Sequence, residues 1–115
     1  MRLTTDLWIA ALMRRVFGEG GFAAVMRRGA SEAGAAFIVI RDREGRATLY
    51  GPAPQTSYDS GRPEDRQFSQ LAAGVEMDQV ETRLQKEARF DPDFWVVELE
   101  PGKTGVEELL SISEP

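Results

Sequence analysis

The stretch from residue 34 to residue 51 limits the possible folds of this chain more than any other segment. Residues 35–40 are continuously apolar and rich in β-branched side chains, which is typical of a central strand covered on both faces. Residues 42–45 read Asp-Arg-Glu-Gly, a turn with glycine late in it, and residues 47–50 return as a partner strand. The sequence therefore predicts a β-hairpin here and a sheet built around it.

Two other segments have the periodicity of amphipathic helices. After Thr4 or Thr5 as the N-cap, apolar residues fall in two adjacent i,i+4 rows, and the glycine-rich residues 18–21 end the first helix. A second helix is predicted from an N-cap at Asp78 to about Phe90, where an Asp-Pro pair disfavours further helix.

Three more segments have the features of strands. Residues 22–28 alternate, with Phe22, Ala24 and Met26 on one face, and residues 94–100 alternate in the same way. Residues 67–72 fit either an edge strand or a short helix, and we favour the strand. The predicted order is α-β-β-β-β-α-β. Because consecutive strands are joined by short turns, we expect an α+β fold with a mainly antiparallel sheet of four to five strands and two helices on one face.

The length and composition of the chain predict one domain with a real core. It has 115 residues, of which 42% are hydrophobic and 29% charged, as is usual for globular domains. We expect residues 1–101 to form this domain and the acidic residues 102–115 to form a loose tail. The first residues lack the pattern of a signal peptide, and no apolar run approaches the ~20 residues of a membrane span, so we expect a cytoplasmic protein with no membrane partner.

The absence of histidine and cysteine excludes most familiar catalytic designs. Zinc sites are built mainly from these two residue types, and the Ser-His-Asp and Cys-His nucleophile systems require them. The sequence indicates no cofactor, and acid–base chemistry is left to Asp, Glu, Tyr and Lys. We therefore expect a domain that binds rather than one that catalyses.

Charge is distributed unevenly along the chain, whose net charge is −5. Residues 1–62 hold nine arginines and six acidic residues, whereas residues 63–115 hold five basic and thirteen acidic residues. This overall acidity disfavours nucleic acid as a partner, because such binding depends on neutralising phosphates. We expect the two halves to complement each other within the fold or across a dimer.

A tyrosine- and proline-rich loop is the predicted ligand site. Aromatic side chains beside a proline-rich segment can form a platform for a peptide or a base, and arginines nearby can bind an anionic group. The structural alternative is that the tyrosine ends a strand over the core and the prolines only stiffen a loop. The predicted ligand-binding residues are Tyr50, Pro52, Pro54, Gln55, Tyr58, Arg27, Arg28 and Arg62.

Two further hypotheses remain open. Asp91, Asp93 and Glu98 flank the last strand, so their carboxylates can converge on Mg²⁺ in a small enzyme acting on a phosphoester. The structural alternative is a helix stop followed by solvent-facing acids. The second hypothesis is an arginine-based binder of anionic ligands. It requires one shared face for Arg27, Arg28, Arg62 and Arg66.

Four segments of the chain are distinctive when taken together in this order: residues 3–8, residues 20–25 with 27–29, residues 49–55 and residues 89–98. They resemble an uncharacterised domain-of-unknown-function family of small alphaproteobacterial proteins. The resemblance covers roughly residues 3–100 and implies a bacterial cytosolic protein, but no activity, ligand or catalytic residue.

We expect the chain to be a small non-catalytic binding or protein-interaction module whose partner is a second copy, in a homodimer, or another protein. The broad apolar stripe of the first helix, with Trp8 and Phe17, exceeds what one sheet face is expected to cover. Surplus apolar surface of this kind usually marks an interface.

Overall fold

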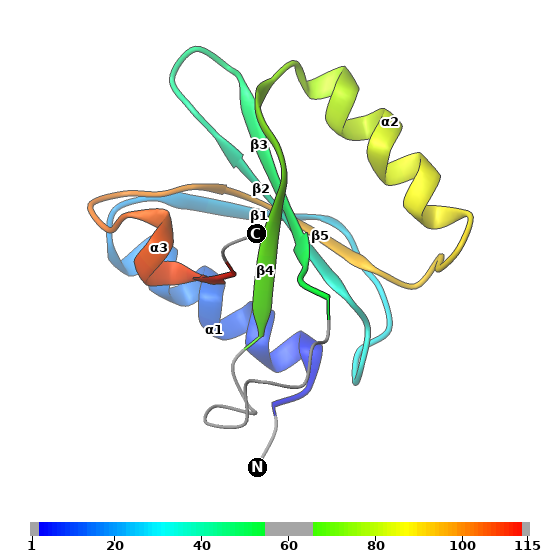
Figure 1. Ribbon diagram of the computed structural model, residues 1–115. Helices are drawn as coiled ribbons and strands as arrows, with labels where there is room; N and C mark the ends of the chain where they lie inside the picture. Colours follow the sequence, from blue (N-terminus) through cyan, green and yellow to red (C-terminus); the bar gives the residue numbers. More distant parts are fainter. Residues whose placement is uncertain (1–2, 55–65, 114–115) are drawn as a thin grey trace.

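The computed structural model describes residues 3–54 and 66–113, which form a six-stranded mixed sheet with helices on both faces (Figure 1). The α+β class is as expected, while the details differ. The helices are α1 (Thr5–Gly18), α2 (Met77–Ala88) and α3 (Val106–Leu109). The strands are β1 (Phe22–Arg27), β2 (Ala36–Arg41), β3 (Ala47–Pro52), β4 (Gln67–Val75), β5 (Trp95–Glu100) and β6 (Ser111–Ile112).

The sheet has the order β1-β5-β2-β3-β4-β6. Strand β5 enters between β1 and β2, antiparallel to the first and parallel to the second, and β6 is parallel to β4. The expected mainly antiparallel sheet of four to five strands is therefore replaced by a mixed sheet of six. The cause lies at residues 94–97, which read Phe-Trp-Val-Val and are all buried, as suits a central strand covered on both faces.

The two long helices cover opposite faces, which corrects the expectation of both on one face. Ile9 and Val16 of α1 pack with Ile38 in one core cluster. Val80 of α2 packs with Val39 in the other. Since β2 is apolar on both faces, each face needs its own cover, and one helix lies on each (Figure 1).

Helix α1 crosses its face of the sheet diagonally (Figure 1). Near its N-terminus Trp8 stacks on Phe68 of β4, with 5.6 Å between ring centroids. At its C-terminal end Val16 lies beside Gly21, just before β1, where the Gly21 amide donates to the Val16 carbonyl. Thr4 is the N-cap, as expected. The C-terminal part of α1 is thus joined directly to the start of β1.

The segment before α2 settles two sequence expectations. Residues 67–75 are strand β4, so strand rather than helix is confirmed there. Helix α2 begins at Met77, with Glu76 as N-cap, and ends at Ala88. The Glu76 amide donates a hydrogen bond to Gln79 Oε1 at 3.2 Å. Glu76 is therefore the N-cap in place of the predicted Asp78. The helix is displaced by one or two residues from the prediction at each end.

The residues after β5 pack on the sheet instead of forming the loose tail expected from their acidity. Leu109 and Leu110 are buried in the α1-side core, and the Ser113 amide donates to the Phe68 carbonyl at 2.7 Å. Val106 and Ile112 pack on the same core and β6 pairs with β4, so apolar burial and strand pairing together hold this acidic segment in place. No helix in the described part of the chain is long and apolar enough to cross a membrane.

Candidate functional site

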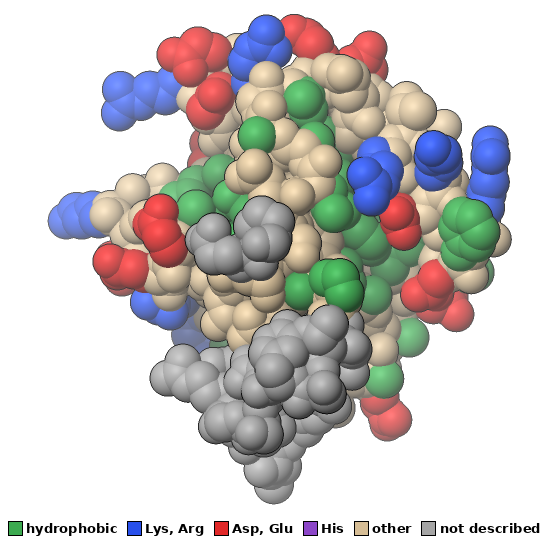
Figure 2. Space-filling view, viewed as in Figure 1, with side chains coloured by type: hydrophobic (Ala, Val, Ile, Leu, Met, Phe, Trp, Pro, Cys, Tyr) green, Lys and Arg blue, Asp and Glu red, His purple; other side chains and the backbone are tan. Residues whose placement is uncertain are grey.

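A single helix, α2, lies on one face of the sheet and leaves a hollow on each side of itself. A helix is about 10 Å wide and strands are about 4.8 Å apart, so one helix covers only about two strands. Val80 is the buried residue of α2, whereas Leu84 and Ala88 are half-buried. Figure 2 shows apolar side chains that remain visible between the charged residues of this part of the surface.

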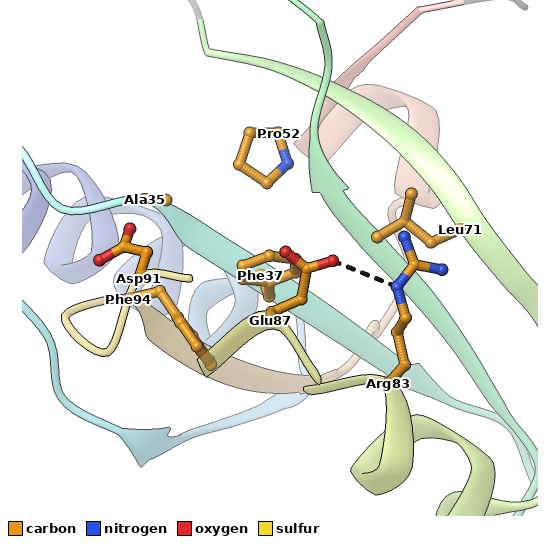
Figure 3. Close-up of a pocket in the computed structure, with 8 residues that line it drawn as sticks. All are labelled: Ala35, Phe37, Pro52, Leu71, Arg83, Glu87, Asp91 and Phe94. Carbon is orange, nitrogen blue, oxygen red and sulfur yellow. Dashed lines mark hydrogen bonds and ion pairs between the residues drawn. The ribbon is translucent and has the colours of Figure 1, made fainter. Parts of the chain in front are cut away.

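The first hollow is a cavity of about 270 Å³ beside β3 and β4. Its walls are apolar and include Phe37 and Leu71, while Arg83, Glu87 and Asp91 supply its charges (Figure 3). Arg83 Nε contacts Glu87 Oε2 at 3.2 Å, so the arginine is neutralised and a net negative charge remains at the rim. This cavity therefore suits an apolar group better than an anion.

The second hollow is a cavity of about 330 Å³ between α2 and β1. Met26, Leu84 and Val96 line it, together with Arg27. The Arg27 guanidinium lies 4.5 Å from the centroid of the Phe94 ring, and its Nη2 donates to the Pro92 carbonyl at 2.7 Å. These contacts hold the Arg27 side chain in a defined position in the lining of the second cavity.

Strand β1 lies at the outer side of this second cavity. Within the described residues β1 pairs with β5 alone, so its other edge carries backbone donors and acceptors without a neighbouring strand. Phe22 is 50% exposed and Met26 46% exposed, and Phe17 packs edge-on against Phe22 at 6.0 Å. An apolar edge strand next to a partly apolar groove is the arrangement that binds extended polypeptide.

The residues of the predicted tyrosine–proline site are dispersed in the structure. Tyr50 is buried in the α1-side core, Pro52 lines the first cavity, and Pro54 is exposed. Arg27 lines the second cavity, while Arg28 lies 5.0 Å from the Trp95 ring centroid. The predicted residues that lie outside the described part of the chain are Gln55, Tyr58 and Arg62.

Tyr50 is held in its neutral form. Burial raises the pKa of the Tyr50 phenol above its usual value, and the negative charge of Glu107 raises it further. A phenol of this kind is a poor base near neutral pH, so Tyr50 has a packing role rather than an acid–base role.

The carboxylates of the magnesium hypothesis do not converge. Asp91 Oδ1 accepts a hydrogen bond from the Asp93 amide at 3.0 Å, and Glu98 Oε2 lies 3.4 Å from Arg41 Nη1. Throughout residues 3–54 and 66–113, no group of three or more acidic side chains is placed to hold a metal ion. The geometry therefore gives no support to a cation site at Asp91, Asp93 and Glu98.

Two of the arginines of the anion-binding hypothesis, Arg27 and Arg28, are separated, while Arg66 stacks on Trp8, which packs on the α1-side core. Arg27 stacks on Phe94 of the α2-side core, whereas Arg28 stacks on Trp95 of the α1-side core. The structure therefore shows no shared basic face for these two residues.

Sequence reasoning identified the alternation of Phe22, Ala24 and Met26 but missed their place at an open edge of the sheet. A strand with one exposed apolar face looks the same in sequence at the centre of a sheet and at its edge. The missing information is the strand order, which depends on β5 far along the chain.

Comparisons with known proteins give consistent results. A family model described as "Protein of unknown function (DUF1491)" matches residues 3–106. The chain is 45% identical to a protein from A. tumefaciens with a solution structure, with a TM-score of 0.83 and coverage of 100% of this chain and 98% of that one. A DUF1491 family protein from Caulobacter crescentus CB15 has a crystal structure that is 33% identical, with a TM-score of 0.74 and coverage of 99% and 100%. An NMR structure of a DUF1491 family protein from the same organism is 32% identical, with a TM-score of 0.74 and coverage of 99% of each chain. No curated protein matches the chain.

Proposed function

The chain belongs to the DUF1491 family, and from that premise we propose that it is a non-catalytic protein-interaction module that binds an extended polypeptide segment at the β1 edge. This membership confirms the family resemblance of the sequence. The family description names no activity, so the proposal rests on the chemistry of this surface.

The observation that best supports this proposal is that the unpaired edge of β1 borders the second cavity, which is a groove between β1 and α2. An added strand makes main-chain hydrogen bonds to such an edge, and every second side chain of it points to the groove side. The groove offers apolar contacts at Met26 and Leu84 and polar groups at Glu81 and Gln85. This combination fits a segment in which apolar and polar residues alternate.

The lining of the second cavity carries charges of both signs, which help to orient a bound segment. Arg27 is held by the Pro92 carbonyl and the Phe94 ring, and Glu81 of α2 contributes a carboxylate. Opposite charges in one groove favour one direction of the bound chain over the other. This feature favours polypeptide over a lipid or a nucleic acid.

The proposal is tested by selection from a displayed library of random peptides. Peptides that bind are expected to shift the backbone amide resonances of β1 and α2. They are expected to lose at least about tenfold in affinity for Met26→Asp, because a charge in the groove is desolvated by the bound strand. Leu7→Asp is the matched control, since Leu7 is also an exposed apolar residue but lies on α1.

Peptides that bind both variants equally, or that shift resonances of α1 alone, would contradict the proposed site. An absence of any selected peptide from a chain that is monomeric in solution would contradict strand addition itself.

A further inference from the structure

Resting on this proposed function, we infer that the strand received by the β1 edge is β1 of a second copy of the chain. The two strands pair antiparallel about a two-fold axis through Ala24, which joins two six-stranded sheets into one. Such an interface is self-complementary, because each copy offers and receives the same strand.

Symmetry restricts the register of this pairing. When the two-fold axis is perpendicular to the sheet, one residue must lie opposite its own copy, since paired residues share a face and neighbours do not. With Ala24 on the axis, Phe22 lies opposite the partner's Met26, and Met26 lies opposite the partner's Phe22. Both contacts cover side chains that are half-exposed in the single chain.

Neighbouring registers fit less well. With the bulge at Met26 and Arg27 counted as one position, an axis through Val25 places Phe22 opposite the partner's Gly29, and an axis through Ala23 places Met26 opposite the partner's Gly20. Only the register at Ala24 brings the two exposed apolar side chains of the strand together, as a sulfur–aromatic contact on each side of the axis. The small side chain of Ala24 leaves room for its own copy.

The β-bulge between Val25 and Arg27 supports this arrangement. Alternation places Phe22 and Ala24 on the α2 side, because Ala23 is buried in the α1-side core. The bulge keeps both Met26 and Arg27 on the α2 side as well, where both line the second cavity. The residues that meet in the pair are therefore on the same face.

Charge is complementary in the same register. The exposed Arg28 follows β1, and because Met26 and Arg27 share one position at the bulge, pairing about Ala24 brings Arg28 opposite the partner's Gly21. That position is two residues from the partner's Glu19 and close to the C-terminal end of its α1, both of which are negative. The positive end of each strand thus meets the negative end of its copy.

Neither long helix blocks the edge. Helix α1 packs against the face of β1 that carries Ala23, and α2 packs against β3 and β4. The Phe17 ring, already against Phe22, is at the boundary of the interface and is covered further by the partner. Part of the exposed apolar surface of the first helix, at Phe17, is therefore buried in the proposed dimer.

Disulfide trapping tests the register directly, because the chain has no native cysteine. Opposite Cα atoms in an antiparallel pair are about 4.5–5.5 Å apart, which a disulfide can span. Ala24→Cys is expected to form a covalent dimer under mild oxidation, whereas Ala11→Cys, on the exposed side of α1, is the control that forms no disulfide-linked dimer. A mixture of Phe22→Cys and Met26→Cys is expected to form the mixed disulfide, while each variant alone does not.

Light scattering supplies the second measurement. The wild-type chain is expected to have twice the mass of one 12.8 kDa chain, and Met26→Asp is expected to weaken association by at least about tenfold. A dimer that neither cross-links at position 24 nor responds to Met26→Asp would place the interface elsewhere. A monomer that still binds selected peptides at β1 would overturn the homodimer and leave the proposed function standing, whereas a monomer that binds no peptide would overturn both.

Discussion

Replacing the buried Thr5 by valine removes a hydroxyl that joins three parts of the chain. Thr5 has no exposed surface, and its Oγ1 donates to the Gly34 carbonyl at 2.8 Å. The same oxygen accepts from Arg66 Nη2 at 2.8 Å. Valine has nearly the same shape, so Thr5→Val removes these two hydrogen bonds without opening a large cavity.

The expected loss follows from the kind of bond removed. A neutral hydrogen bond contributes about 1 kcal/mol, and one with a charged donor contributes about 1.5–3 kcal/mol. Because the Gly34 carbonyl is left in a buried position, little of this is recovered from water. We expect the free energy of unfolding to fall by about 2–4 kcal/mol and the melting temperature to fall by roughly 8–16 °C for a domain of this size.

Urea denaturation followed by tryptophan fluorescence measures this change, with Trp8 and Trp95 as reporters. Thr5→Ser is the control, because it keeps the hydroxyl and removes one methyl group, at a cost of about 1 kcal/mol. If Thr5→Val unfolds at the same urea concentration as Thr5→Ser or a higher one, the hydroxyl does not stabilise the fold and the reasoning is refuted.

Two further predictions concern Tyr50 and a pair of glycines. Because the raised pKa of Tyr50 keeps its phenol protonated while the unfolded chain ionises near pH 10, stability should fall as the pH rises above about 10, and Tyr50→Phe should show a shallower fall in denaturation from about pH 9 to about pH 11. Gly51→Ala should destabilise by about 1–3 kcal/mol in thermal unfolding, since its Cβ would lie 2.7 Å from Leu71 Cδ1, whereas Gly18→Ala, with nothing within 4 Å, should be neutral or stabilising. Equal effects of the two glycine variants would count against the close packing at β3.

The elements that the sequence predicted well are those determined by neighbouring residues. The hairpin of β2 and β3 follows from the apolar run at residues 35–40 and the turn after it. The end of α1 follows from the glycines after Phe17. Periodicity and turn residues are local signals, so they were sufficient for these segments.

Sheet order and helix placement depend on contacts between distant segments. Residues 22–27 and 95–100 pair although about 70 residues separate them. No local sequence pattern predicts that pairing. The burial of Phe94 and Trp95 on opposite faces was visible in sequence as two adjacent large apolar residues. Two adjacent large apolar side chains point to opposite faces of a strand, so both faces of the sheet must be covered. This pattern favours one helix on each face over two helices on one face.

The candidate site depended on that same missing pairing. Phe22 and Met26 are ordinary strand residues until β1 is known to be an edge. The tyrosine–proline loop attracted attention because of its composition, yet Tyr50 faces the core. Exposure at an edge is a property of the assembled sheet, so composition alone could not reveal it.

The insertion of β5 between β1 and β2 also matters while the protein is being made. Translation adds roughly 5–20 residues per second, so the ribosome takes roughly 3–14 s to proceed from residue 27 to residue 95. During that interval the nascent β1 lacks its only partner strand within the described sheet, and both of its edges are open. The same strand that we assign to recognition in the finished protein is therefore the segment most exposed to premature pairing between nascent chains on one polysome.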